Sequence, residues 1–253
     1  MLYHMVKYGN ISGSQAMAII CNNIGGEKAE DVLSLVLNQL VPVIIKKFLP
    51  LDQLESVNQK MFDATWEILN AQEHALSTAQ MLVTAIIGFS SEGKSAQKLI
   101  EWFNQGFCGK KEFELTLKQK HAIVTEISSS IEITKQQKDL MLTKLEEEKS
   151  DMLSNTKAYC KAANPDPKSK KEIWDGLFAT TFDKESLLDH ENLCDGLWHR
   201  NQLSLMEGFA DHFFTQIESA CESKARNLSE HVYYGLAPTH DTSDAGIKRF
   251  SDF

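Results

Sequence analysis

The sequence predicts an all-α fold, and two observations lead to that prediction. Only five Pro and thirteen Gly occur among the 253 residues, and few stretches are rich in Val, Ile and Thr without interruption by Glu, Lys or Gln. This composition favours helices over strands. Apolar residues also recur at three- and four-residue spacing through most of the chain, which is the period of an amphipathic helix.

The expected helices follow from this spacing and from the turn residues between them. Residues 32–40 and 43–48 form two short helices with a break at Pro42. Residues 54–69 carry one apolar stripe, which includes Met61 and Trp66, so this helix packs on one side only. Further helices are expected over residues 74–89, 94–105, 113–130, 134–148, 151–163, 168–181, 199–217 and 218–235.

These helices are expected to form one domain over residues 1–238. A single amphipathic hairpin cannot bury its apolar face alone, so successive pairs should stack into a curved array. The sequence contains no exact internal repeat, which indicates an irregular array of the HEAT or armadillo type. Residues 239–253 have no apolar period and are expected to form a flexible tail.

Charge and cysteine content exclude several classes of protein. The 26 Lys and Arg against 35 Asp and Glu give a net charge of -9 without a long basic tract, which argues against a nucleic-acid partner. The five Cys are widely spaced and form no C-x-x-C pair, so a reducing, cytoplasmic location fits best. No run of about eighteen apolar residues occurs, so no membrane span is expected.

The sharpest local motif runs from Gly88 to Ser95 and fits the G-x-x-x-x-G-K-S pattern of phosphate-binding loops. A nucleotide-hydrolysing enzyme built on Gly93, Lys94 and Ser95 would need a preceding strand inside a parallel sheet. The sequence offers no alternation of strands and helices. We therefore interpret the motif as a loop between two helices, in which Ser91 caps the second helix.

No catalytic, cofactor-binding or metal-binding residue is assigned from the motifs. The densest group of potential metal ligands lacks the H-E-x-x-H spacing of a zinc peptidase, and that motif occurs nowhere in the chain. We interpret this group as a partly buried Cys with two surface His; its members are His190, Glu191, Cys194 and His199. The four tryptophans lie on apolar stripes and are expected to anchor the core; they are Trp66, Trp102, Trp174 and Trp198.

Three stretches of the chain share a family-like order of residues. The first lies between Leu2 and Glu27 and resembles a helix pair with Leu, aromatic, Met, basic and Gly positions. The second is the most specific and contains an alanine-rich face, Asn164-Pro165-Asp166 and then a Lys-x-x-x-Trp helix. The third runs through two helices to the close of the domain, with Met206, Phe209, Phe213, Phe214, Arg226, Gly235 and Pro238.

Together these stretches resemble the C-terminal helical domain of the aminopeptidase N family of zinc metallopeptidases, and most closely its bacterial subgroup. The resemblance implies a right-handed superhelix of helix pairs that packs against the catalytic domain of the same enzyme and narrows the access of peptide substrates. It also implies removal of N-terminal amino acids with zinc as the cofactor. In the family the zinc ligands, the activating Glu and the G-x-M-E-N motif precede this region, so none is carried over.

Two functions stay open from the sequence. The first is the C-terminal domain of a zinc aminopeptidase, inactive alone, present either as a fragment or as a detached domain whose exposed apolar face would invite self-association. The alternative is a stand-alone HEAT-like protein-interaction scaffold. A polar or acidic, pocketed face would favour the first function, and a broad apolar face would favour the second.

Overall fold

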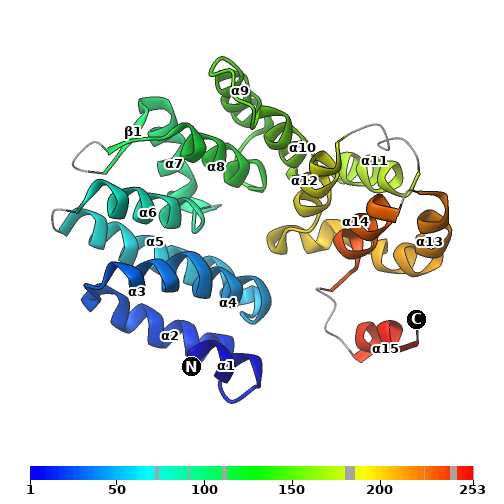
Figure 1. Cartoon of the computed structure of the whole chain (residues 1–253), viewed down its shortest axis with the longest axis horizontal. Coiled ribbons are helices and arrows are strands. Elements are labelled where there is room, and N and C mark those ends of the chain that lie inside the picture. The colour runs from blue at the N-terminus through cyan, green and yellow to red at the C-terminus, as the bar shows by residue number, and fades with distance from the viewer. Residues whose placement is uncertain are drawn as a thin grey trace. The chain divides into compact units, whose positions relative to one another are not determined.

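The structure is a computed structural model, and it confirms the all-α fold (Figure 1). It describes residues 1–71, 74–90, 92–109, 113–179, 186–224, 226–239 and 244–252. Contacts divide the chain into two compact units, Met1–Glu148 and Lys149–Phe253, where the sequence analysis expected one domain over residues 1–238. None of the helices in the described ranges is long and apolar enough to cross a membrane.

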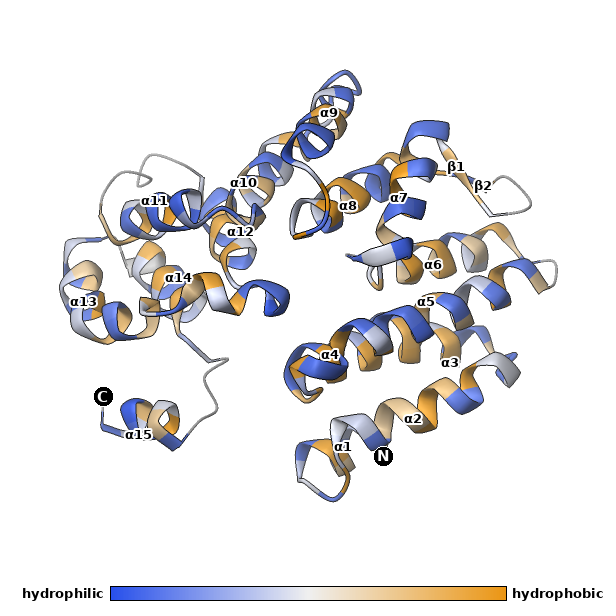
Figure 2. Cartoon of the chain, turned by 180° about the vertical axis from the view of Figure 1, so that it is seen from behind, coloured by the Kyte–Doolittle hydropathy of each residue, from blue (hydrophilic) through white to orange (hydrophobic). Residues whose placement is uncertain are grey.

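Unit 1 is a stack in which helices pack mainly on their neighbours along the chain. Their apolar sides face neighbouring helices and their polar sides face outward (Figure 2). Two short strands pair antiparallel after the seventh helix, β1 (Phe107–Cys108) with β2 (Phe113–Glu114). The helices are α1 (Leu2–Lys7), α2 (Gly13–Asn23), α3 (Glu30–Leu35), α4 (Val41–Lys47), α5 (Leu54–Ala71), α6 (Leu76–Ile87), α7 (Gly93–Gln105), α8 (Leu117–Ser128) and α9 (Lys135–Glu146).

Local sequence explains where several of these helices begin. Ser12, Thr116 and Thr134 each accept a hydrogen bond from the backbone N–H three residues later. The side-chain oxygen of the Gln at that position accepts a bond from the backbone N–H of the capping residue. Such reciprocal capping satisfies two backbone donors that the first turn leaves unpaired. The break expected at Pro42 is absent: a π-helical segment, Val36–Leu40, joins α3 to α4 without interruption, and Pro42 lies in the first turn of α4. Pro42 has no N–H to donate to the preceding turn, so regular α-helical bonding gives way to the π-helical segment before it.

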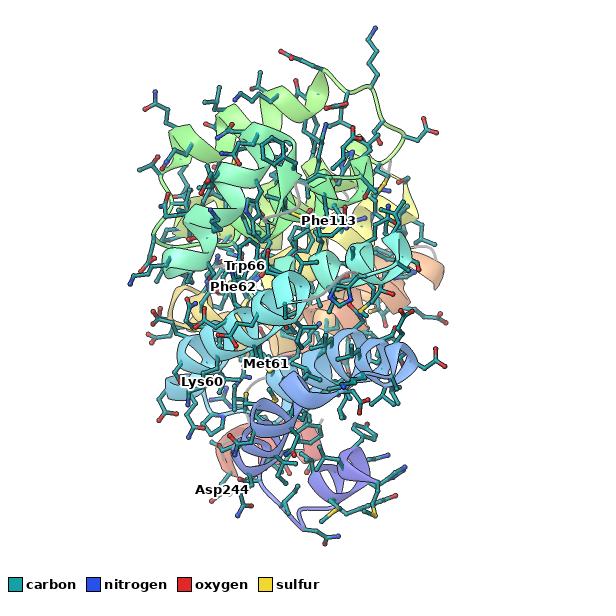
Figure 3. The ribbon with its side chains drawn as sticks, turned by 90° about the vertical axis from the view of Figure 1, so that its left-hand side faces the viewer. Lys60, Met61, Phe62, Trp66, Phe113 and Asp244 are labelled. Carbon is teal, nitrogen blue, oxygen red and sulfur yellow. The ribbon has the colours of Figure 1, made fainter. Side chains whose placement is uncertain are left out.

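An aromatic stack ties α5 to α7. The rings of Phe62 and Trp66 lie 6.3 Å apart on α5 (Figure 3), and Trp66 lies 5.2 Å from Trp102 of α7. Trp102 is 2% exposed, whereas Trp66 is only partly buried. The structure therefore confirms Trp102 as a core anchor and places Trp66 at the edge of the core.

The phosphate-loop motif lies between two helices, α6 and α7, and not after a strand. The backbone N–H of Gly93 donates to a carboxylate oxygen of Glu132 at 2.8 Å, and Glu92 occupies the cap position of α7. Glu92 in turn accepts bonds from the Ser130 hydroxyl at 2.7 Å and the Ile131 N–H at 2.9 Å. The Glu132 carboxylate occupies the Gly93 N–H of this loop, and helix α6 rather than a strand precedes it, so the helix–loop–helix interpretation holds. The expected cap, Ser91, lies outside the described residues.

A partly buried acid lies beside this loop and makes unit 1 sensitive to pH. Burial, and then the nearby charge of Glu92, raise the pKa of Glu126 to about 8. A carboxyl with a raised pKa in the folded state retains its proton where the unfolded chain has lost it. Stability from this group is therefore full below the unfolded pKa and is lost as the pH rises toward 8.

We predict that Glu126→Gln removes this loss, because the amide stays neutral at every pH. The free energy of unfolding of the wild type should fall relative to that of the variant by at most about 1.4 kcal/mol per pH unit between about pH 5 and 8. Urea unfolding at several pH values measures the difference. Glu67→Gln, at an exposed site on α5, is the control, and its free energy of unfolding should change with pH as that of the wild type does. The same pH dependence in Glu126→Gln and the wild type would contradict the prediction.

Unit 2 contains a further set of helices and departs from the sequence expectations in three places. Its helices are α10 (Leu153–Ala163), α11 (Pro167–Phe178), α12 (Leu187–Leu197), α13 (Phe209–Ser223), α14 (Arg226–Leu236) and α15 (Asp244–Asp252), with a 3₁₀ helix, η4 (Arg200–Met206). Helix α12 was not predicted. The helix predicted over residues 199–217 is interrupted at Gly208, whose φ of +84° is a conformation that favours glycine.

The third departure concerns the expected tail over residues 239–253, which contains α15. Phe250 of this helix packs edge-to-face against Phe214 of α13, with ring centroids 5.0 Å apart. Arg249 also pairs with Asp211 at 2.7 Å. These contacts join residues distant in sequence, which explains why the period of residues 239–253 alone did not indicate a docked helix.

The ammonium group of Lys170 joins three helices of unit 2. Lys170 is 0% exposed, and its Nζ donates to the carbonyl oxygens of Ala162 at 2.7 Å, Gly196 at 3.1 Å and Leu197 at 2.8 Å. These carbonyls belong to the last turns of α10 and α12, where the helix dipoles favour a cation. One side chain of α11 thereby fixes the ends of two other helices.

An aromatic cluster packs on the next turn of α11. Trp174 is 0% exposed and its indole N–H donates to Nδ1 of His212 at 2.6 Å. Its ring contacts Phe178, Phe209 and the partly buried Trp198. The structure confirms Trp174 as the core anchor of this unit, and Trp198 packs against it from the side.

Candidate functional site

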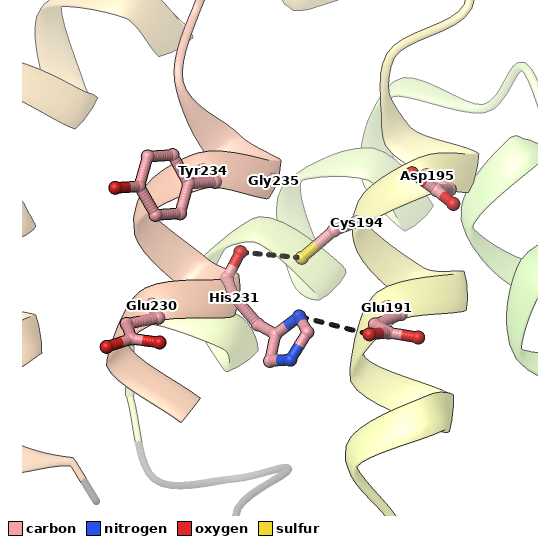
Figure 4. A pocket seen from close by; sticks show the side chains of 7 residues that line it. All are labelled: Glu191, Cys194, Asp195, Glu230, His231, Tyr234 and Gly235. Carbon is pink, nitrogen blue, oxygen red and sulfur yellow. Dashed lines mark hydrogen bonds and ion pairs between the residues drawn. The ribbon is translucent and has the colours of Figure 1, made fainter. Parts of the chain in front are cut away.

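The best candidate site of unit 2 is a pocket of about 470 Å³ between α12 and α14 (Figure 4). Helix α12 contributes Glu191, Cys194 and Asp195, which recur at a three- to four-residue spacing and so share one face. Helix α14 contributes the opposite wall with Glu230, His231, Tyr234 and Gly235. The two helices pack directly against each other.

Two contacts across the pocket hold its walls together. Nδ1 of His231 lies 3.4 Å from a carboxylate oxygen of Glu191, and the Cys194 thiol donates to the backbone carbonyl of His231 at 3.9 Å. Tyr234 is 76% exposed at the mouth. Gly235 allows the close approach of the helices, because a Cβ at that position would lie 2.5 Å from the Cβ of Cys194.

The pocket is acidic, and its thiol is inert. Burial raises the pKa of Cys194 to about 12, and the charges of Asp195 and Glu191 add to the effect. A thiol with such a pKa stays protonated near neutral pH, so it is not a nucleophile there. Three carboxylates against one His give the pocket a negative potential that attracts cationic groups such as ammonium and guanidinium.

The structure separates the four residues that the sequence grouped as potential metal ligands. Glu191 and Cys194 line the pocket, but His190 is 1% exposed and its Nδ1 contacts the carbonyl of Ser186 at 3.1 Å. His199 lies against Tyr159, with Nε2 3.0 Å from the phenolic oxygen. The prediction that both His lie at the surface is therefore wrong for His190. Cys194 was expected to be partly buried and is fully buried, at 3% exposure.

No three His, Cys, Asp or Glu side chains converge to hold a metal ion within the ranges that the structure describes. Ser186 caps α12 one turn before His190, and His190 belongs to the buried side of this helix with Leu193 and Leu197. Three of the four residues lie on α12, where His190 faces away from the side shared by Glu191 and Cys194, and His199 follows the end of this helix.

Sequence reasoning did not find the α14 side of the pocket or the acidic residue Asp195. The signal that could have found them was the Ser186 cap followed by Leu187, Leu193 and Leu197, which marks α12 as a helix. With α12 recognised, Glu191 and Asp195 fall one turn apart. The pairing of α12 with α14 is a tertiary contact, and no local pattern encodes it.

No protein-family model matches the sequence, and no curated protein is significantly similar to it. The site must therefore be interpreted from its own residues.

We predict that Gly235→Ala destabilises the protein by about 1–3 kcal/mol, because the added methyl group would overlap Cys194 across the helix interface. Thermal or urea unfolding measures the change. Gly25→Ala is the control, since a Cβ there meets no atom within 4 Å. If Gly235→Ala unfolds within about 0.5 kcal/mol of the wild type, the close packing of α12 on α14 is wrong.

Proposed function

We propose that this chain acts as the C-terminal helical domain of a zinc aminopeptidase, in which it shapes the access of peptides and does not itself carry out the hydrolysis. The observation that carries the proposal is the acidic pocket between α12 and α14. Peptide substrates of such an enzyme present a cationic amino terminus, and Glu191, Asp195 and Glu230 offer complementary charge.

The residues that carry the family resemblance support the proposal because they form the framework beneath this pocket. Asp166 caps α11 by accepting the Ser169 N–H at 2.8 Å. Four positions later Lys170 joins α10 to α12, and Trp174 fills the aromatic cluster. Gly235 allows α14 to approach α12. At these positions the resemblance concerns the shape of a domain, which is the role proposed here.

The proposal includes features that the whole enzyme would supply. Zinc and the residues that activate water would belong to a catalytic domain of the same enzyme, and the helical units would form a right-handed superhelix beside it. The partners of this chain would then be that catalytic domain and peptide substrates, in the cytoplasm.

A stand-alone interaction scaffold is the second candidate, and one observation favours it. Met152, Leu187 and Leu188 are 40%, 38% and 48% exposed near the starts of α10 and α12. Ser154 donates to Asp189 at 3.1 Å, so these two helix starts lie together. Clustered exposed apolar side chains are typical of protein-binding surfaces.

The experiment compares hydrolysis of fluorogenic aminoacyl amides and short peptides, with zinc present, by the 253-residue chain and by a polypeptide extended with any coding sequence that precedes Met1. We expect activity only in the extended polypeptide. In that polypeptide, Glu191→Gln with Glu230→Gln should lower kcat/KM for peptides rich in Lys and Arg by roughly three- to tenfold, because each lost charge is worth up to about 1 kcal/mol.

Glu172→Gln on α11 is the matched control, since Glu172 is exposed and outside the pocket. It should leave kcat/KM unchanged for basic and apolar peptides alike. Hydrolysis by the 253-residue chain alone would show that the chain carries its own active site and would overturn the proposal. An inactive extended polypeptide would favour the scaffold.

A further inference from the structure

A second cavity lies in unit 1 between α2 and α5 and has a volume of about 580 Å³. This size lies within the range of about 300–1,000 Å³ that is usual for small-molecule sites. The two helices pack against each other beside it, and the Cys21 thiol of α2 contacts the sulfur of Met61 at 3.6 Å. The pocket between α12 and α14 belongs to the other unit and shares none of these residues.

The cavity presents one positive and one negative charge from the same face of α5. Lys60, which extends from α5 (Figure 3), and Asp63 both line it and stand three residues apart. Within the described part of the chain, Lys60 makes no ion pair, with Asp63 or with any other acid. Asp63 accepts a bond from Gln59 through one oxygen only.

Lys60 and Asp63 are both exposed, so their charges lie at the open side of the cavity. Burial raises the pKa of the Cys21 thiol, and the charge of Lys60, which lines the same cavity, acts in the opposite direction. The apolar part of the cavity is formed by Met17, 1% exposed, and Val57, 8% exposed. Asn22 adds an amide at the rim.

We propose that this cavity binds a free α-amino acid with an apolar side chain. Such a molecule carries a carboxylate and an ammonium group on one carbon, so that Lys60 binds the first and Asp63 the second. Its side chain then enters the cavity above the buried Met17 and Val57, where the ligand's own apolar surface is removed from water. An internal peptide segment lacks both charges, and a simple carboxylate or amine satisfies only one of them. The inference goes beyond the proposed peptidase function and does not depend on it.

The test is titration of the 253-residue chain with L-leucine or L-methionine. Binding is measured by calorimetry and by the protection of Cys21 against a thiol reagent. Cys160→Ser and Cys221→Ser remove the other two partly exposed thiols and so isolate the Cys21 signal. We expect a Kd on the order of 0.1–1 mM, which is reasonable for a ligand of this size. The probes 4-methylpentanoate and isoamylamine, each with a single charge, should bind at least tenfold more weakly.

Two variants assign the charges. Lys60→Gln and Asp63→Asn should each weaken leucine binding at least fivefold, whereas Lys28→Gln, an exposed lysine of the same unit outside the cavity, should leave it unchanged. Equal binding of 4-methylpentanoate and leucine would overturn the proposal in favour of a carboxylate site. Unchanged affinity in Lys60→Gln and Asp63→Asn, or absence of any leucine binding, would also overturn it.

Discussion

The buried ammonium group of Lys170 is the constraint on which unit 2 depends. Removing an ammonium ion from water is costly, and here three backbone carbonyls of Ala162, Gly196 and Leu197 offset that cost. Those carbonyls end α10 and α12, so the cation also interacts favourably with two helix dipoles. Gly196 makes the arrangement possible, because a Cβ there would lie 2.6 Å from the carbonyl oxygen of Tyr159. The close crossing of α10 and α12 follows from these contacts.

The pocket follows from that crossing. With one face of α12 fixed against α10, its opposite face presents Glu191 and Asp195 to α14, and Gly235 sets the distance between the two helices. The result is a pocket lined by three carboxylates. Its single thiol, Cys194, is protonated near neutral pH, and its charges are carboxylates that attract a cationic ligand. A role in binding or guiding peptides agrees with this chemistry better than a role in bond cleavage.

Sequence patterns predicted the helical class and several helices well, because those depend on local period. The stripe of residues 54–69 predicted α5, and the turn around Pro165 predicted the start of α11. Helix α12 was not predicted, because its polar residues, including Glu191 and Asp195, interrupt the apolar period. The break at Gly208 was not predicted either, because it depends on backbone conformation. Only part of the candidate site could be predicted from the sequence, because its α14 wall meets α12 through tertiary packing. The raised pKa of Glu126 likewise depends on burial by the tertiary fold and then on Glu92, which is distant in sequence.

The most direct test of this account is the free energy of unfolding of Lys170→Met, measured by urea denaturation beside Lys171→Met. Methionine keeps the length and apolar stem of lysine but leaves the three carbonyls without their donor, so we expect a loss of roughly 3 kcal/mol or more. Lys171 is exposed and pairs with Asp175 on the surface, so its replacement should cost less than about 1 kcal/mol. Equal, small losses in the two variants would contradict the central role of Lys170.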